Sequence, residues 1–178
     1  MIKKYDLGYT VVELLAVVAI LMIVSGIVIG ILYSTLRGSA KTKITTDISQ
    51  NGNYAISVIS DIIVDSTNIT KIGGSDIADC TSSPEGSSIT FKRLNGNFTN
   101  LACENQTITS DSASLINTNL AELVDGTCSF YCSQLSNDPY AIPIVRVKFK
   151  LQDKGTGLSE TKASSTFETS VSLRNYSP

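Results

Sequence analysis

The residues Leu7-Gly8-Tyr9-Thr10-Val11-Val12-Glu13-Leu14 lead into the apolar run that decides the fold of this chain. From Leu14 to Leu32 the run carries no charge, and only one serine and two glycines fall outside the apolar set. A helix of about twenty apolar residues is long enough to cross a lipid bilayer. One carboxylate, that of Glu13, lies at the edge of the run, where a charge is costly in hydrocarbon and needs a partner.

The composition limits what kind of protein this is. The chain has 178 residues, which fits one domain plus a membrane segment, and its net charge of −2 gives no basic footprint for nucleic acid. It has no histidine, which removes Ser-His-Asp and Cys-His nucleophiles and every metal site that uses histidine. We therefore expect no catalysis and no cofactor. After residue 36 the chain is rich in Ser, Thr, Asn, Gly and Asp, which is typical of an exported, turn-rich β domain.

Two ordinary explanations of the apolar run leave something unexplained. A secretory signal has an apolar core of roughly 7–15 residues and a small-x-small cleavage site; this core is longer, and no A-x-A lies at its end. A plain signal anchor explains the run but not why Glu13 is placed at its start. Charge does not decide the orientation, because basic residues lie on both sides of the run: Lys3, Lys4, Arg37, Lys41 and Lys43.

A third explanation is a family resemblance. Lys3-Lys4, followed by Gly8-Tyr9-Thr10-Val11-Val12-Glu13-Leu14-Leu15, resembles the class III leader of type IV pilins and pseudopilins. In that family a short basic leader ends in Gly, a membrane peptidase cuts after this Gly on the cytoplasmic side, and the new first residue is N-methylated. The resemblance implies cleavage between Gly8 and Tyr9, N-methylation of Tyr9, and an assembly role for Glu13. Tyr9 departs from the usual Phe but keeps an aromatic ring.

The spacing gives the resemblance a physical meaning. Cleavage after Gly8 would create an α-ammonium group on Tyr9, and residues four apart share a helix face. The positive end of the helix dipole lies at the same place. The amine of the same chain or that of a neighbour can therefore neutralise Glu13; in the family the neighbour's amine is the implied partner. Gly26 and Gly30 form a G-x-x-x-G, which is either a close helix contact or a point where the helix loosens.

The apolar pattern continues beyond the membrane segment. We predict one helix from about Thr10 to about Val64, because no proline interrupts it and its second half carries an apolar stripe at helical spacing: Ile44, Ile48, Ala55, Ile59, Ile62 and Ile63. Gly38 and Asn51-Gly52-Asn53 are expected to weaken this helix. The predicted organisation is a cleaved leader (1–8), a transmembrane and assembly half-helix (9–36), an amphipathic half-helix (37–66) and a disulfide-bonded β-sheet head (67–178).

The remaining residues predict a sheet. Residues 66–86 are polar and are expected to form a loop with little regular structure. Asn95-Gly96 and Asp125-Gly126 are turn signals. Strands are expected at 88–94, 97–103, 127–133, 144–152 and 167–173, and shorter apolar stretches lie at 106–108, 113–116 and 120–124. The expected fold class is therefore α+β, with one antiparallel sheet of four to six strands against the helix.

A weaker resemblance reaches into the head. Gln50-Asn51-Gly52-Asn53-Tyr54-Ala55-Ile56, with Ile59 and Asp61-Ile62 after it, is similar to the second half of the long helix in minor pilins of the PilW/PulJ type. The ending Phe167-Glu168-Thr169-Ser170-Val171-Ser172-Leu173-Arg174-Asn175 is similar to the last strand of the same group. These likenesses are short and cover about a quarter of the chain.

The four cysteines all follow the apolar run, and an even number on an exported side favours disulfides. Cys128 and Cys132 would lie about 13 Å apart in a flat strand, so either the strand breaks there or each pairs elsewhere. The pairs Cys80–Cys103 and Cys128–Cys132 are only narrowly favoured over crossed pairings. A zinc site is disfavoured, because only the last spacing resembles a zinc knuckle.

Two carboxylate pairs could be interpreted as sites. Asp61 and Asp65 lie four apart on the helix, a spacing open to a general acid and base pair, but a solvated helix face explains them better. Asp76 and Asp79 lie in a loop where some pseudopilins bind calcium, yet no EF-hand spacing is present. We therefore expect no metal at either pair.

These features together predict a structural subunit that is inserted once in the cytoplasmic membrane, with its N-terminus inside and its head outside. The expected partners are other pilin subunits, the prepilin peptidase and N-methyltransferase, an inner-membrane assembly platform, and lipid before assembly. After assembly it would lie in a surface pilus, as a minor pilin. A pseudopilin of a type II secretion or DNA-uptake system is the first alternative, and an uncleaved, membrane-anchored adhesin is the second.

Overall fold

The computed structural model describes residues 10–135, 141–155 and 162–177, and its single helix matches the sequence prediction. Helix α1 spans Val11–Val64. The chain divides into two compact units, Met1–Ala40 and Lys41–Pro178, and α1 contributes to both of them. In the first unit α1 is exposed along its whole length. In the second unit it forms part of a hydrophobic core.

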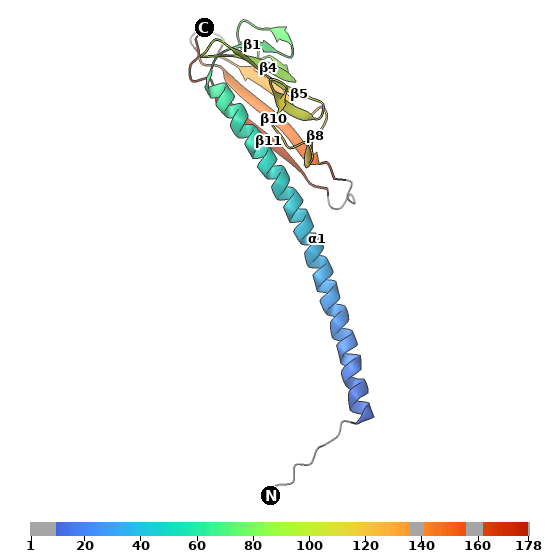
Figure 1. The fold of residues 1–178 in the computed structure, drawn as a ribbon. Coiled ribbons are helices and arrows are strands. Elements are labelled where there is room, and N and C mark those ends of the chain that lie inside the picture. The colour runs from blue at the N-terminus through green and yellow to red at the C-terminus, as the bar shows by residue number, and fades with distance from the viewer. Residues whose placement is uncertain (1–9, 136–140, 156–161, 178) are drawn as a thin grey trace. The chain divides into compact units, whose positions relative to one another are not determined.

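The described residues of the head form eleven strands in two antiparallel sheets (Figure 1). The first sheet has the order β2-β1-β4-β5-β6-β7, with bounds β1 Ser66–Ile72, β2 Ser75–Asp76, β4 Ser88–Arg93, β5 Phe98–Glu104, β6 Thr107–Ser110 and β7 Ala113–Ser114. The second has the order β11-β10-β9-β3, with β8 also pairing β10, and bounds β3 Glu85–Gly86, β8 Ala121–Leu123, β9 Ser129–Ser133, β10 Ile144–Asp153 and β11 Ser164–Ser172.

The predicted α+β class is confirmed, but the prediction of one sheet with four to six strands is wrong. The prediction of a loop at 66–86 is also wrong, because strands β1, β2 and β3 lie there. The hairpin around Asn95-Gly96 is confirmed: β4 pairs β5, and Gly96 has a φ of 82°, which the turn requires. Strand β10 alternates buried and exposed side chains as predicted over most of its length.

The core of the head lies between the second half of α1 and the two sheets. Five residues of the predicted stripe are buried, namely Ile48, Ala55, Ile59, Ile62 and Ile63, whereas Ile44 is only partly buried. Gly52, which was not predicted as part of the stripe, is buried with them. Phe91 from the first sheet and Phe130 and Phe149 from the second are all completely buried in the same cluster. Each such side chain contributes about 1.5–3 kcal/mol on burial, so the amphipathic half of α1 is fixed by packing rather than by its own helix propensity.

Gly52 has the opposite role from the one that the sequence suggested. It is buried, and a Cβ placed on it would collide with the ring of Phe167 in β11. The same ring stacks on Phe149 of β10, with 5.4 Å between the ring centroids. The absence of a side chain at Gly52 therefore lets β11 approach the helix, and this glycine is a packing contact within α1 rather than a weak point.

Substituting Gly52 with alanine is expected to lower the free energy of unfolding of the head by up to about 2 kcal/mol. Alanine favours a helix over glycine by about 1 kcal/mol, but overpacking a dense core typically costs about 1–3 kcal/mol. Urea unfolding of the full chain in detergent micelles, followed by tyrosine fluorescence, measures the change.

Gly38 provides the matched control, because a Cβ there meets no atom within 4 Å. Gly38→Ala is expected to be neutral or slightly stabilising. The double variant Gly52→Ala/Phe167→Leu is expected to recover part of the loss, since the smaller side chain yields space. Equal stabilisation by Gly52→Ala and Gly38→Ala would contradict the packing role.

Candidate functional site

The first candidate site is the exposed apolar segment of α1 in the first unit. From Val11 to Leu36 every side chain is exposed, including large ones such as Met22 (71%) and Ile29 (65%). The segment is long and apolar enough to cross a membrane once, and its most apolar stretch has no buried residue. Such a surface is unfavourable in water, at about 25 cal/mol for each Å² of apolar area. It therefore requires lipid or other protein around it.

Two hydroxyl side chains within this segment donate hydrogen bonds to the helix backbone. The hydroxyl of Ser25 donates to the carbonyl oxygen of Leu21 at 2.7 Å, and that of Thr35 donates to the carbonyl of Ile31 at 2.9 Å. A polar group in hydrocarbon must find its partner within the protein. A Cβ placed on Gly26 or Gly30 would meet no atom within 4 Å, so the G-x-x-x-G leaves an open surface on the helix.

Glu13 lies in the first turn of α1, where a capping residue precedes it. The backbone N–H of Glu13 donates to the Thr10 hydroxyl oxygen at 3.3 Å and to the Thr10 carbonyl at 3.1 Å. Thr10 is thus the N-cap, and Thr10-Val11-Val12-Glu13 has the spacing of a capping box. Thr10 was not predicted as an N-cap, because Glu13 was interpreted only as a charge. The T-x-x-E spacing of a capping box is nevertheless visible in the sequence.

The two residues of the predicted cleavage site, Gly8 and Tyr9, lie outside the described residues. The distance between the Tyr9 amine and Glu13 therefore stays a prediction. The structure places the Glu13 backbone at the N-terminal end of α1, where the helix dipole favours a negative charge. Cleavage after Gly8 would therefore place Glu13 in the first helical turn after the new N-terminus.

The second candidate site is the pair of disulfides in the head. Cys80 bonds to Cys132, with Cα atoms 5.5 Å apart, and Cys103 bonds to Cys128, with Cα atoms 6.2 Å apart. The favoured pairs Cys80–Cys103 and Cys128–Cys132 are wrong, although all four cysteines do form disulfides. Strand β9 continues unbroken through Cys132, so this residue stays too far along the strand from Cys128 for a bond.

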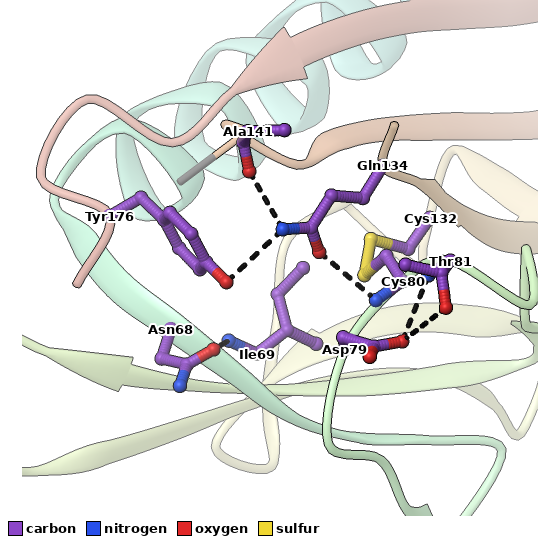
Figure 2. Close-up of a disulfide and its surroundings, with 9 residues drawn as sticks. All are labelled: Asn68, Ile69, Asp79, Cys80, Thr81, Cys132, Gln134, Ala141 and Tyr176. Carbon is purple, nitrogen blue, oxygen red and sulfur yellow. Dashed lines mark hydrogen bonds between the residues drawn. A yellow bond between two sulfur atoms is a disulfide. The ribbon is translucent and has the colours of Figure 1, made fainter. Parts of the chain in front are cut away.

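Gln134 joins three segments beside the Cys80–Cys132 bond, as Figure 2 shows. Its side-chain oxygen accepts the backbone N–H of Cys80 at 3.3 Å. Its side-chain nitrogen donates to the carbonyl of Ala141 at 2.7 Å and to the hydroxyl oxygen of Tyr176 at 3.2 Å. The side-chain amide of Gln134 thus uses both its oxygen and its nitrogen. It connects the segment before β3, and the C-terminal residues, to the end of β9.

The loop carboxylates are occupied by protein groups. One Asp79 oxygen accepts the Thr81 hydroxyl at 2.7 Å and the Thr81 N–H at 3.0 Å, and these bonds lower the pKa of Asp79 below its usual value. Asp76 lies 3.2 Å from the ammonium group of Lys71. Within residues 10–135, 141–155 and 162–177, no group of three potential metal-binding side chains comes together. Asp61 in α1 and Asp65, which directly follows the helix, are both exposed.

Two shallow hollows of about 420 and 460 Å³ lie on the outer face of the second sheet. Both are lined by Glu85, Ser129 and Lys148, and one of them also contains Arg146 and Glu168. Arg146 is 3.8 Å from Glu168 across the β10–β11 ladder, and both side chains are about half exposed. A solvated ion pair of this kind contributes little stability, and these side chains form no nucleophile–base pair.

Comparisons with protein families, curated proteins and solved structures found no match. The candidate sites are therefore judged on chemistry alone. Of these, the apolar half of α1 with Glu13 at its start is the one that demands a molecular partner, because it cannot stay exposed to water. The disulfides and the Gln134 contacts hold the head together.

Proposed function

We propose that this chain is a structural subunit of the type IV pilin class, cleaved after Gly8, N-methylated on Tyr9 and assembled through the apolar half of α1. The observation that carries the proposal is the exposed apolar helix with a carboxylate in its first turn, directly after the leader-like sequence. The small disulfide-bonded α+β head on the second half of the same helix supports it.

The carboxylate of Glu13 needs a counter-charge in the assembled state. A buried carboxylate in a low-dielectric environment is costly without a partner, and an ammonium group about 4 Å away gains about 4 kcal/mol at an effective dielectric constant of about 20. Cleavage creates such an ammonium group on Tyr9. Helices packed with a stagger would place one subunit's Glu13 beside the next subunit's amine, and lipid would be replaced by neighbouring apolar helices.

The partners of the apolar segment change on assembly. Before assembly the apolar segment lies in the cytoplasmic membrane, where the prepilin peptidase reaches Gly8. After assembly its neighbours are other pilin subunits, in a surface pilus or in a periplasmic pseudopilus. A pseudopilin of a type II secretion or DNA-uptake system would use the same helix and leader, so the same observations support both systems.

The uncleaved, membrane-anchored adhesin is the alternative from another class. It has the same exposed helix but requires no free amine near Glu13. The state of the N-terminus of the mature chain therefore separates it from a pilin.

The mature chain is expected to begin at N-methylated Tyr9 when it is produced together with a prepilin peptidase. Intact-mass spectrometry and N-terminal sequencing measure this. Gly8→Leu, which places a bulky side chain at the cleavage site, is expected to keep Met1 and the unmethylated leader. The control is the same wild-type chain without the peptidase. A mature chain that keeps Met1, or that is cut elsewhere, would overturn the pilin proposal.

A further inference from the structure

The edges of the two sheets differ greatly in length. Strands β2 and β7 are the edges of the first sheet, and β3 is an edge of the second; each has two residues. Strand β8, which pairs only with β10, has three. Such short edges offer little to an approaching chain. Strand β11 is also an edge, but it spans nine residues, Ser164–Ser172. Among the described residues, no strand pairs with its outer side.

The free side of β11 is regular. Its register with β10 runs from Ile144↔Ser172 to Gln152↔Ser164 without a shift, so no bulge bends the edge away. The strand contains no proline and no lysine, two residues that commonly protect edges. Its one charged residue is Glu168.

The hydrogen bonds show which backbone groups point outward. The N–H of Asp153 donates to the carbonyl of Ala163 at 3.0 Å, and the N–H of Leu173 donates to the carbonyl of Pro143 at 3.4 Å. In an antiparallel ladder, residues that bond to the partner alternate with residues whose N–H and C=O point away. The odd-numbered residues of β11 therefore bond to β10. The outward backbone groups belong to the even-numbered residues Ser164, Thr166, Glu168, Ser170 and Ser172.

The side chains of β11 also remain incompletely covered. In β10 the inward side chains of Val145, Val147 and Phe149 are fully buried. In β11 the inward side chains, including Phe167 and Val171, are only half buried. Another strand beside β11 would cover them and would pair the outward backbone groups at the same time.

Strand β10 indicates what such a strand should look like, because it already faces the same side chains from the other side. It places Lys148 opposite Glu168 and Phe149 opposite Phe167. A second copy of β11 in full antiparallel overlap would instead place two Glu168 side chains opposite each other, which is unfavourable. The favoured occupant thus alternates apolar residues with basic ones.

We propose that the outer edge of β11 binds an extended segment of another polypeptide chain by strand addition, with apolar residues facing inward beside Phe167 and a basic residue opposite Glu168. Backbone hydrogen bonds supply affinity in this mode, and alternate side chains supply selectivity. The proposal rests on the head alone and does not depend on processing at Gly8.

The test uses the wild-type full-length chain in detergent micelles and a synthetic peptide with the sequence of Ile144–Asp153. Amide hydrogen exchange, resolved to single residues, is measured with and without the peptide. The amides of Thr166, Glu168 and Ser170 are expected to exchange at least about tenfold more slowly with saturating peptide, because they gain hydrogen bonds. The amides of Phe167 and Thr169 are expected to change little, since they already bond to β10.

Two pairs of controls define the edge and the charge. Ser170→Pro removes one outward N–H without removing a bond to β10 and is expected to abolish peptide binding, whereas Ser170→Ala is expected to bind like the wild type. Thr166→Pro is a second edge variant, should Ser170→Pro fail to fold. A peptide in which the residues of positions 146, 148 and 150 are all glutamate is expected to bind at least about tenfold more weakly.

Each of the following results would overturn the proposal: no slowing of exchange at the even-numbered residues, wild-type binding by a folded Ser170→Pro variant, or equal binding of the acidic peptide. Protection of the same amides without peptide that rises with protein concentration would also overturn it, because a second copy would then occupy the edge.

Discussion

Replacing Glu13 with leucine is expected to leave membrane insertion and cleavage after Gly8 intact and to reduce incorporation into fibres by at least about tenfold. Tenfold corresponds to about 1.4 kcal/mol of interaction free energy, which is well below the gain expected for a carboxylate and an amine in a low-dielectric environment. The apolar segment becomes more hydrophobic, so insertion is not impaired. Quantitative immunoblotting of sheared fibres against the membrane fraction measures the ratio.

Two further variants separate the charge of Glu13 from its place in the helix cap. Glu13→Gln keeps a side chain that fits the capping box but removes the charge. Thr10→Val removes the N-cap hydroxyl, at about 1 kcal/mol, and keeps the charge. The charge argument predicts that Glu13→Gln fails like Glu13→Leu and that Thr10→Val assembles nearly normally. Wild-type incorporation of Glu13→Leu would show that no amine pairing occurs at this residue.

Removing the Cys80–Cys132 disulfide by a double alanine substitution is expected to destabilise the head by at least about 4 kcal/mol. The bond closes 52 residues, but the Cys103–Cys128 bond already closes 25 of them. With this inner bond intact, about 27 residues remain to be restricted, which corresponds to about 3.5 kcal/mol in the chain-entropy model. Both cysteines of the first bond are buried, at 2% and 0% exposure, so their loss also leaves unfilled space. The matched variant Cys103→Ala/Cys128→Ala has half-buried cysteines and should lose less. Urea unfolding under non-reducing conditions compares the two.

The connectivity itself can be tested by mass spectrometry of the non-reduced protein. Phe130 and Tyr131 lie between Cys128 and Cys132, so chymotrypsin separates these two cysteines. Fragments that join Cys80 to Cys132 and Cys103 to Cys128 are expected. A fragment that joins Cys80 to Cys103 would contradict the structure.

The sequence predicted the helix well because two strong signals agree along it. Composition indicates the apolar half, and the stripe from Ile44 to Ile63 indicates the packed half. Gly52 was misjudged, because an isolated glycine in a helix looks like a weakness until the ring of Phe167 is known to lie against it. Local propensity cannot reveal such a contact.

Strand β1 was missed for a different physical reason. Its register with β4 shifts between Ser66 and Asn68 and again between Ile69 and Lys71, so the side chains do not alternate with a period of two. Two-residue strands such as β3 carry no pattern at all. The disulfide pairing depends on which strands are neighbours, and the sequence left that open. Of the candidate site, Glu13 and the apolar run could be found, whereas Thr10 was visible but was not recognised as a cap.

The disulfide between Cys80 and Cys132 also has a mechanical consequence. A subunit held by its helix and pulled through its head would bear a load along the chain. The two cysteines are separated by 52 residues, and the bond between them prevents this segment from extending under force. Roughly 180 Å of extended chain is therefore withheld while the bond is intact. The Cys103–Cys128 bond lies inside that closed segment. The elements that can still extend lie outside the segment closed by this disulfide, and they include α1, β10 and β11. The contact of Gly52 with Phe167 joins α1 to β11. Under tension, this contact between helix and strand would bear the load before the cross-linked strands do.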